Sequence, residues 1–116
     1  MAILAQLVDD VAVSKFELKV GQVTLGRHPD NDIMIDDLSV SGHHAIIEVK
    51  ESKYLEGTLE IFVVDKNSKN GTFINEKQVD ERERLIDGDI LRVAWNKFKL
   101  IDAVGDNLAS TAHVLQ

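Results

Sequence analysis

The sequence predicts an all-β protein, a two-sheet antiparallel β-sandwich of about 11 strands with its binding loops at one end. Short apolar runs rich in β-branched residues recur along the chain, and polar turn residues separate them. Several runs alternate apolar and polar residues, which is the pattern of a strand with one buried face. No segment before the last stretch shows sustained helical periodicity, so the pattern favours a sandwich over a mixed fold.

The first half of the chain contributes four predicted strands. Phe16, Leu18 and Val20 alternate with charged residues, which is typical of a half-buried strand. A tight reversal at Gly21 leads into the next strand. The predicted strands of this half are residues 3–8, 16–20, 23–27 and 33–35.

The second half holds the two clearest strands, residues 44–50 and 58–64. Their sequences, HAIIEVK and TLEIFVV, are rich in β-branched side chains, and a polar loop joins them. We expect Trp95 to be a core residue or to pack at a sheet edge. The remaining predicted strands are residues 78–79, 84–86, 90–95 and 97–101.

Length and composition limit the class of protein. At 116 residues the chain fits one domain; we assign residues 1–102 to it and residues 103–116 to a C-terminal tail or linker. The absence of cysteine excludes disulfides, thiolate metal sites and thiol catalysis. The first ten residues lack the basic lead and long apolar run of a secretory signal. No stretch approaches the roughly 18 apolar residues of a membrane span, and we expect a cytoplasmic protein.

The charge balance limits the possible partners. The formal net charge is −7 and the pI about 4.9, so the surface repels nucleic-acid backbones and anionic membranes. We therefore expect neither a nucleic acid nor a membrane as a partner. A phosphopeptide needs only a local positive site, because physiological salt screens charges beyond about 8 Å.

Three loop patches together supply the groups that can hold a phosphate and the peptide backbone beside it. They are Gly26-Arg27, Ser41-Gly42-His43-His44 and residues 67–75 (NSKNGTFIN). These patches contain a guanidinium, several hydroxyls, an ammonium and side-chain amides. In order and content they resemble the forkhead-associated (FHA) domain, a reader of phosphothreonine peptides, and the resemblance covers residues 23–100. It implies an FHA/SMAD-like sandwich without a cofactor.

The resemblance implies five phosphopeptide-binding positions: Arg27, Ser41, Gly42, Lys69 and Asn70. The arginine of the Gly-Arg pair contacts the phosphate, and the serine donates its hydroxyl to it. Asn70 matches the asparagine that bonds the peptide backbone, and Lys69 precedes it at a position that often contacts the phosphate. The implied partner is a protein phosphorylated on threonine by a serine/threonine kinase, in preference to phosphoserine.

Two positions leave other interpretations open. Taken alone, Arg27 could be a rim arginine paired with Asp30 or Asp32. Gly42 departs from the family, which often has arginine or asparagine at this position, so a hydrogen-bond donor is lost. His43 could compensate by turning toward the phosphate, or it could be an exposed loop histidine.

The resemblance assigns a loop-structuring role to five further residues: Gly26, His44, Gly71, Thr72 and Asn75. The histidine of the Ser-x-x-His pattern pins its loop by hydrogen bonds and does not touch the ligand. The glycine of Asn-Gly-Thr-x-x-Asn is expected to take a positive φ. We expect Asn75 to brace a loop and Thr72 to make local hydrogen bonds.

Other functions fit the sequence less well. The runner-up is an interaction domain on the same fold that binds its partner without phosphate, because Gly42 lacks a common contact. Ser41 with His44 could suggest a hydrolase, but no oxyanion-hole motif accompanies them, so we expect no enzyme activity. Adjacent histidines on a strand point to opposite faces, which argues against a metal site at His43 and His44.

The tail suggests one more partner. Thr111 follows Ser110 in a segment without a strand pattern. If a kinase phosphorylated Thr111, the tail could occupy the binding site of its own domain or of a neighbour, because tethering raises its local concentration. The other interpretation is an ordinary linker.

Overall fold

The computed structural model describes residues 2–102. Within this range the chain forms eleven strands in two sheets and no helix, so the predicted all-β sandwich is confirmed. No helix in the described range is long and apolar enough to cross a membrane. The predicted tail, residues 103–116 with Thr111, lies outside the described residues.

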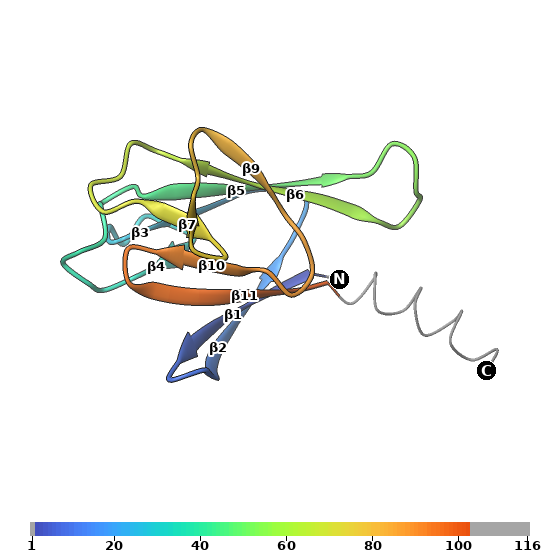
Figure 1. The fold of residues 1–116 in the computed structure, drawn as a ribbon. Helices are drawn as coiled ribbons and strands as arrows, with labels where there is room; N and C mark the ends of the chain where they lie inside the picture. Colours follow the sequence, from blue (N-terminus) through green and yellow to red (C-terminus); the bar gives the residue numbers. More distant parts are fainter. Residues whose placement is uncertain (1, 103–116) are drawn as a thin grey trace.

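One sheet has six strands in the order β2-β1-β11-β10-β7-β8. Figure 1 labels the first five of these strands. All its pairings that the register gives are antiparallel, and Leu4 of β1 lies between Phe16 of β2 and Leu100 of β11. The strands are β1 Ala2–Val8, β2 Val11–Leu18, β7 Thr72–Ile74, β8 Lys77–Gln78, β10 Ile90–Val93 and β11 Asn96–Asp102.

The other sheet has five strands in the order β4-β3-β5-β6-β9. One of its pairings departs from the predicted antiparallel pattern: β3 and β4 are parallel, with Leu25 beside Ile33. Parallel strands usually need a long crossover connection. Here β4 has only two residues and pairs with the last two residues of β3, so a short loop that leaves β3 can turn back beside its end. The strands are β3 Gly21–Gly26, β4 Ile33–Met34, β5 Ala45–Glu51, β6 Leu59–Asp65 and β9 Arg82–Leu85.

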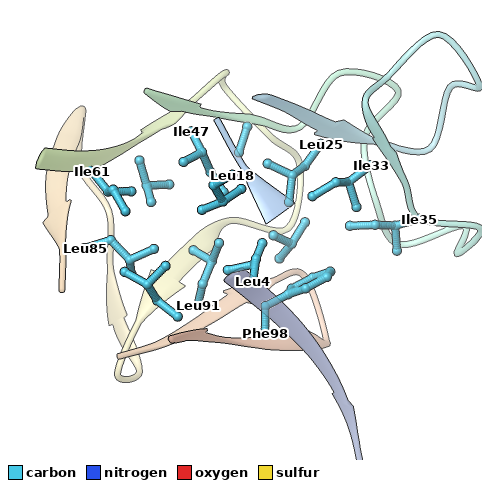
Figure 2. Packing of buried hydrophobic residues seen from close by; sticks show 14 of the residues in the cluster. Leu4, Leu18, Leu25, Ile33, Ile35, Ile47, Ile61, Leu85, Leu91 and Phe98 are labelled. Carbon is cyan, nitrogen blue, oxygen red and sulfur yellow. The ribbon is translucent and has the colours of Figure 1, made fainter. Parts of the chain in front are cut away.

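The core lies between the two sheets (Figure 2). Period-two alternation along β5 buries Ala45, Ile47 and Val49 while the residues between them are only half-buried. Each fully buried leucine, isoleucine or phenylalanine stabilises the fold by about 1.5–3 kcal/mol. The largest side chains that meet here are Leu4, Leu91, Phe98 and Leu100 from the six-stranded sheet and Leu25, Ile33, Ile47, Ile61 and Leu85 from the five-stranded sheet.

Two details differ from the sequence prediction. β2 begins at Val11 rather than at residue 16, because residues 11–15 form the outer arm of a hairpin with β1 and have no buried face. Trp95 is 68% exposed, so its assignment to the core is wrong. The reason is a turn after β10: Ala94 takes a φ of 53°, and Trp95 follows it on the surface.

Candidate functional site

Three loops meet at one end of the sandwich, on the left in Figure 1. They are the β3–β4 loop (27–32), the β4–β5 loop (35–44) and the β6–β7 loop (66–71). The Arg27 N–H donates to the Ser41 carbonyl at 3.0 Å, and the Lys69 N–H donates to Ser41 Oγ at 3.0 Å. We call this the three-loop surface; it brings the predicted site patches together as expected.

Gly26 allows the first two of these loops to touch. A Cβ at this position would lie 2.2 Å from the carbonyl oxygen of Gly42 and 2.7 Å from Nδ2 of Asn31. That carbonyl is itself held, since it accepts from Asn31 Nδ2 at 2.8 Å and from the His28 N–H at 3.1 Å. Any larger residue at position 26 would therefore push the two loops apart.

Ser41 connects all three loops through different atoms. Its carbonyl accepts from Arg27, its N–H donates to His44 Nδ1 at 3.1 Å, and its Oγ accepts from the Lys69 N–H. A serine hydroxyl carries one donor and two acceptor lone pairs. Because the bond from Lys69 uses only an acceptor, the hydroxyl hydrogen of Ser41 remains able to donate to a ligand.

His44 is fully buried beneath this surface, and its two ring nitrogens have opposite roles. Nδ1 faces the Ser41 N–H donor and so accepts; Nε2 lies 2.8 Å from the carbonyl of Gly71 and so donates. The ring is therefore the neutral tautomer with its hydrogen on Nε2. Through it the β4–β5 loop is bonded to the β6–β7 loop, and His44 faces the protein rather than the ligand.

Asn70 forms a second bond between these two loops. Its Nδ2 donates to the Ser39 carbonyl at 2.6 Å, which leaves its other N–H and its Oδ1 for a ligand. Ser39 is held by Asp37, whose Oδ1 accepts from the Ser39 N–H and Oγ at 2.9 Å each. These bonds, with one from Asn96, hold the pKa of Asp37 below its ordinary value and keep the carboxylate ionised.

Asp65 organises the β6–β7 loop, and the sequence analysis missed it. Its Oδ1 accepts from Ser68 Oγ at 2.6 Å and from Thr72 Oγ1 at 2.7 Å. Its Oδ2 accepts from the Ser68 N–H at 3.2 Å. The signal was present in the sequence, since an aspartate three residues before a serine at a strand end is a common turn former. Thr72 is fully buried, and its bond to Asp65 spans the β6–β7 loop rather than staying within its own turn.

The Arg27 side chain is exposed and directed by one backbone bond, from its Nε to the Val40 carbonyl at 3.1 Å. Arg27 pairs with neither Asp30 nor Asp32 in the described structure, so the interpretation as a rim arginine paired with one of them is wrong. Asp32 accepts from the Thr24 N–H, and Asp30 pairs with histidines. The terminal nitrogens of the Arg27 guanidinium thus remain unpaired among the described residues.

His43 is bonded to Asp30 rather than free to reach a phosphate. Its Nε2 lies 3.1 Å from both carboxylate oxygens of Asp30, and its ring stacks on His28 at 5.4 Å between centroids. The hydrogen bond from His43 is the main cause that lowers the pKa of Asp30. The suggested compensation for Gly42 by His43 would require this bond to break.

Gly42 and Lys69 complete the predicted ligand-facing set. A Cβ on Gly42 would meet only His28 Cδ2 at 3.5 Å, and Gly42 is not among the residues with positive φ. A side chain at position 42 is therefore sterically acceptable. The Lys69 side chain is exposed and forms no ion pair within the described part of the chain.

Gly71 and Asn75 shape the strand ends. Gly71 has a φ of 84°, as predicted, and a Cβ there would lie 2.8 Å from Phe73 Cε1. Asn75 also has a positive φ, 50°. Its Oδ1 accepts from the Ile90 N–H at 3.0 Å and its Nδ2 donates to Asp89 at 2.9 Å. It thus braces β7 against β10, away from the three-loop surface.

A two-sheet sandwich with a polar three-loop surface at one end is typical of β-sandwich domains that bind their ligands through loops. Residues 23–94 match the FHA domain, and the chain belongs to this family. It is 40% identical over 94 residues to the glycogen accumulation regulator GarA of Mycolicibacterium smegmatis, covering 81% of this chain and 53% of that protein. It is 38% identical over 90 residues to the oxoglutarate dehydrogenase inhibitor of Corynebacterium diphtheriae, covering 78% and 56%.

A solved structure agrees with this assignment. It comes from work described as the structural and functional analysis of phosphothreonine-dependent FHA domain interactions. Its TM-score is 0.71 at 27% identity, and the match covers 87% of this chain and 95% of the other. The chain spans about half the length of the curated relatives that it matches.

Proposed function

We propose that this chain is a non-catalytic module that binds proteins phosphorylated on threonine, within serine/threonine kinase signalling. One observation carries the proposal: Ser41 bonds to both Arg27 and Lys69, so that a hydroxyl and two cations without an ion pair in the described range lie on neighbouring loops. The solved FHA structure named for phosphothreonine-dependent interactions supports the same function. We propose that the module acts in the cytoplasm together with a serine/threonine kinase that supplies this mark.

The phosphate would lie against Arg27, Ser41 and Lys69. The Nε bond to Val40 directs the guanidinium of Arg27, whose two terminal nitrogens can then donate in parallel to two phosphate oxygens. Ser41 donates its hydroxyl, and Lys69 adds a point charge. A phosphothreonine carries about −1.5 to −2 charges at neutral pH, which these two cations balance.

Asn70 would fix the peptide backbone beside the phosphothreonine. Its bond to the Ser39 carbonyl holds the amide in one orientation, so little side-chain entropy is lost when a peptide binds. The remaining N–H and the Oδ1 can pair with one peptide carbonyl and one peptide N–H. A few charge-assisted bonds of about 1.5–3 kcal/mol each, less ordering costs, lead us to expect roughly micromolar affinity.

The names of the relatives support a regulatory role. One is a regulator of glycogen accumulation and another an inhibitor of oxoglutarate dehydrogenase. We propose that this chain likewise acts by binding another protein rather than by catalysis. Its domain comprises residues 1–102 in this proposal, since β11 ends at Asp102 after pairing with β1, and residues 103–116 form the tail.

A second candidate function is partner binding without phosphate. Gly42 supports it, because no side chain at this position donates to a ligand and His43 is bonded to Asp30. In this alternative the three-loop surface still binds a protein, but the unpaired cations meet carboxylates. The two functions differ in a single measurable property, the dependence of binding on phosphate.

Fluorescence anisotropy with degenerate peptide libraries tests the proposal. We expect the phosphothreonine library to bind and the unphosphorylated library to bind at least tenfold more weakly. Arg27→Ala should abolish the difference. The matched control is Lys15→Ala, since Lys15 is an exposed cation of β2, outside the three-loop surface, and forms no ion pair in the described range. Equal binding of both libraries would establish the phosphate-independent alternative.

A further inference from the structure

A second surface lies on the outer face of the five-stranded sheet, away from the three loops. In the strand register Phe62 of β6 lies between Glu48 of β5 and Arg84 of β9. Three cations surround its ring: Arg82 Cζ lies 3.8 Å from the ring centroid, Arg84 Cζ 5.5 Å and Lys50 Nζ 5.9 Å. We call Phe62 with these three cations and Glu48 the Phe62 patch.

The patch is positively charged on an acidic protein. The whole chain carries a formal charge of −7, yet the Phe62 patch has three cations and one carboxylate. Glu48 accepts from Arg82 Nε at 2.8 Å. Glu60 lies across the strands from Lys50 and is a second carboxylate on this outer face. Neither Lys50 nor Arg84 forms an ion pair within residues 2–102.

Comparison with Arg92 indicates that Arg82 is prepared for a ligand. Both guanidinium groups stack on a phenylalanine, at 3.8 Å for Arg82 on Phe62 and 3.9 Å for Arg92 on Phe73. Arg92 uses Nε, Nη1 and Nη2 in hydrogen bonds, and its side chain is 12% exposed. Arg82 uses Nε alone and is 43% exposed. Its terminal nitrogens are therefore held in place and open to an outside carboxylate.

Apolar side chains adjoin these cations. Ile46 and Val64 form a cross-strand pair on the same outer face, and Val64 lies two residues after Phe62 on β6. Both are half-buried, and the second sheet of the sandwich packs against the opposite face of β5 and β6. A hollow lined in part by Gln22, Glu48 and Lys50 adjoins the patch on the side of β3. A ligand for this face thus needs apolar side chains as well as negative charge.

We propose that the Phe62 patch is a docking surface for an acidic, partly apolar segment of a partner protein. Carboxylates of the segment pair with Arg82, Arg84 and Lys50, while its apolar side chains cover Phe62 and Val64. The surface is separate from the phosphopeptide site, because three residues of β6, or about 10 Å, lie between Phe62 and the start of the β6–β7 loop. The proposal does not depend on recognition of phosphothreonine.

Chemical-shift titration of the full chain tests this surface. The probe is an unphosphorylated peptide of alternating glutamate and leucine, with a lysine–leucine peptide as its counterpart. We expect saturable shifts at amides of β5, β6 and β9 with the glutamate peptide only. The double variant Lys50→Glu/Arg84→Glu should weaken binding at least tenfold, because it reverses two charges and leaves the Arg82–Glu48 bond in place.

The matched control is Lys15→Glu/Lys19→Glu, which makes the same charge change at exposed lysines of the other sheet and the turn after it. Undiminished binding in this control, and in Arg27→Ala, supports the proposal. Equal losses in both double variants would show general charge attraction and overturn it. Absence of shifts on β5, β6 and β9 would also overturn it. So would a Phe62-dependent dimer in sedimentation, or binding to phosphatidylserine vesicles in place of the peptide.

Discussion

Replacing Arg27 by lysine separates recognition by a planar fork from simple attraction between charges. The charge is kept, but the two parallel donors become one ammonium group. The Nε bond to the Val40 carbonyl, 3.1 Å long, is also lost, so the side chain is no longer directed toward the phosphate. One charge-assisted hydrogen bond is worth about 1.5–3 kcal/mol, which corresponds to a loss of about 10- to 150-fold in affinity.

Isothermal titration with a phosphothreonine peptide selected from the library measures this loss. Folding should change little, because the backbone bond from Arg27 to Ser41 does not depend on the side chain and the guanidinium is exposed. Thermal unfolding of the same variant checks this point. If Arg27→Lys retained affinity within threefold of the native protein, a bidentate phosphate contact at Arg27 would be refuted.

Four further outcomes are expected. Gly26→Ala should lower the melting temperature by at least 5 °C, from about 1–3 kcal/mol of overpacking, whereas Gly42→Ala should not, since its Cβ meets only one atom at 3.5 Å. Gly42→Asn should tighten phosphopeptide binding severalfold in the same titration, and unchanged affinity would show that position 42 does not face the ligand. Affinity should fall between pH 7.5 and 5.5, because the phosphate takes up its second proton near a pKa of about 6. Asp37→Asn should destabilise the fold at pH values above the ordinary carboxyl pKa of about 3.9, where Asp37 is ionised in the native protein. In unfolding curves, the stability difference between the native protein and this variant should vanish as pH falls below the lowered pKa of Asp37, because the native residue is then also neutral.

The sequence predicted those parts of the fold that depend on local pattern. The strand expected at residues 44–50 is β5 at Ala45–Glu51, because alternation of buried and exposed residues is readable over a few positions. The positive φ of Gly71 was readable for the same reason, since an asparagine precedes the glycine at a turn. The core alternative for Trp95 was wrong because size and apolarity favour burial, whereas the turn at Ala94 decides where the side chain lies.

The long-range hydrogen bonds that assemble the site could not be predicted from sequence patterns. Asn70 bonds to Ser39 and Asp37 bonds to Asn96, and both pairs are distant in the chain. Nothing in the order of residues brings them together until the two sheets have packed. That the terminal nitrogens of Arg27 have no partner among residues 2–102 could not be predicted either. Two aspartates follow Arg27 closely, and only the fold directs them to other partners.

In the proposed function, most residues of the three-loop surface contact either the ligand or the neighbouring loops, and Ser41 contacts both. The side chains of His44 and Asp65 hydrogen-bond to the protein and hold the loops together. The side-chain ends of Arg27 and Lys69 form no ion pair within residues 2–102 and would contact the ligand. Ser41 accepts from one loop with its oxygen and retains a hydrogen to donate. A phosphate that accepts this hydrogen polarises the hydroxyl and strengthens the bond from Lys69. Binding should therefore tighten the contact between the β4–β5 and β6–β7 loops, so ligand recognition and loop order are coupled at this hydroxyl.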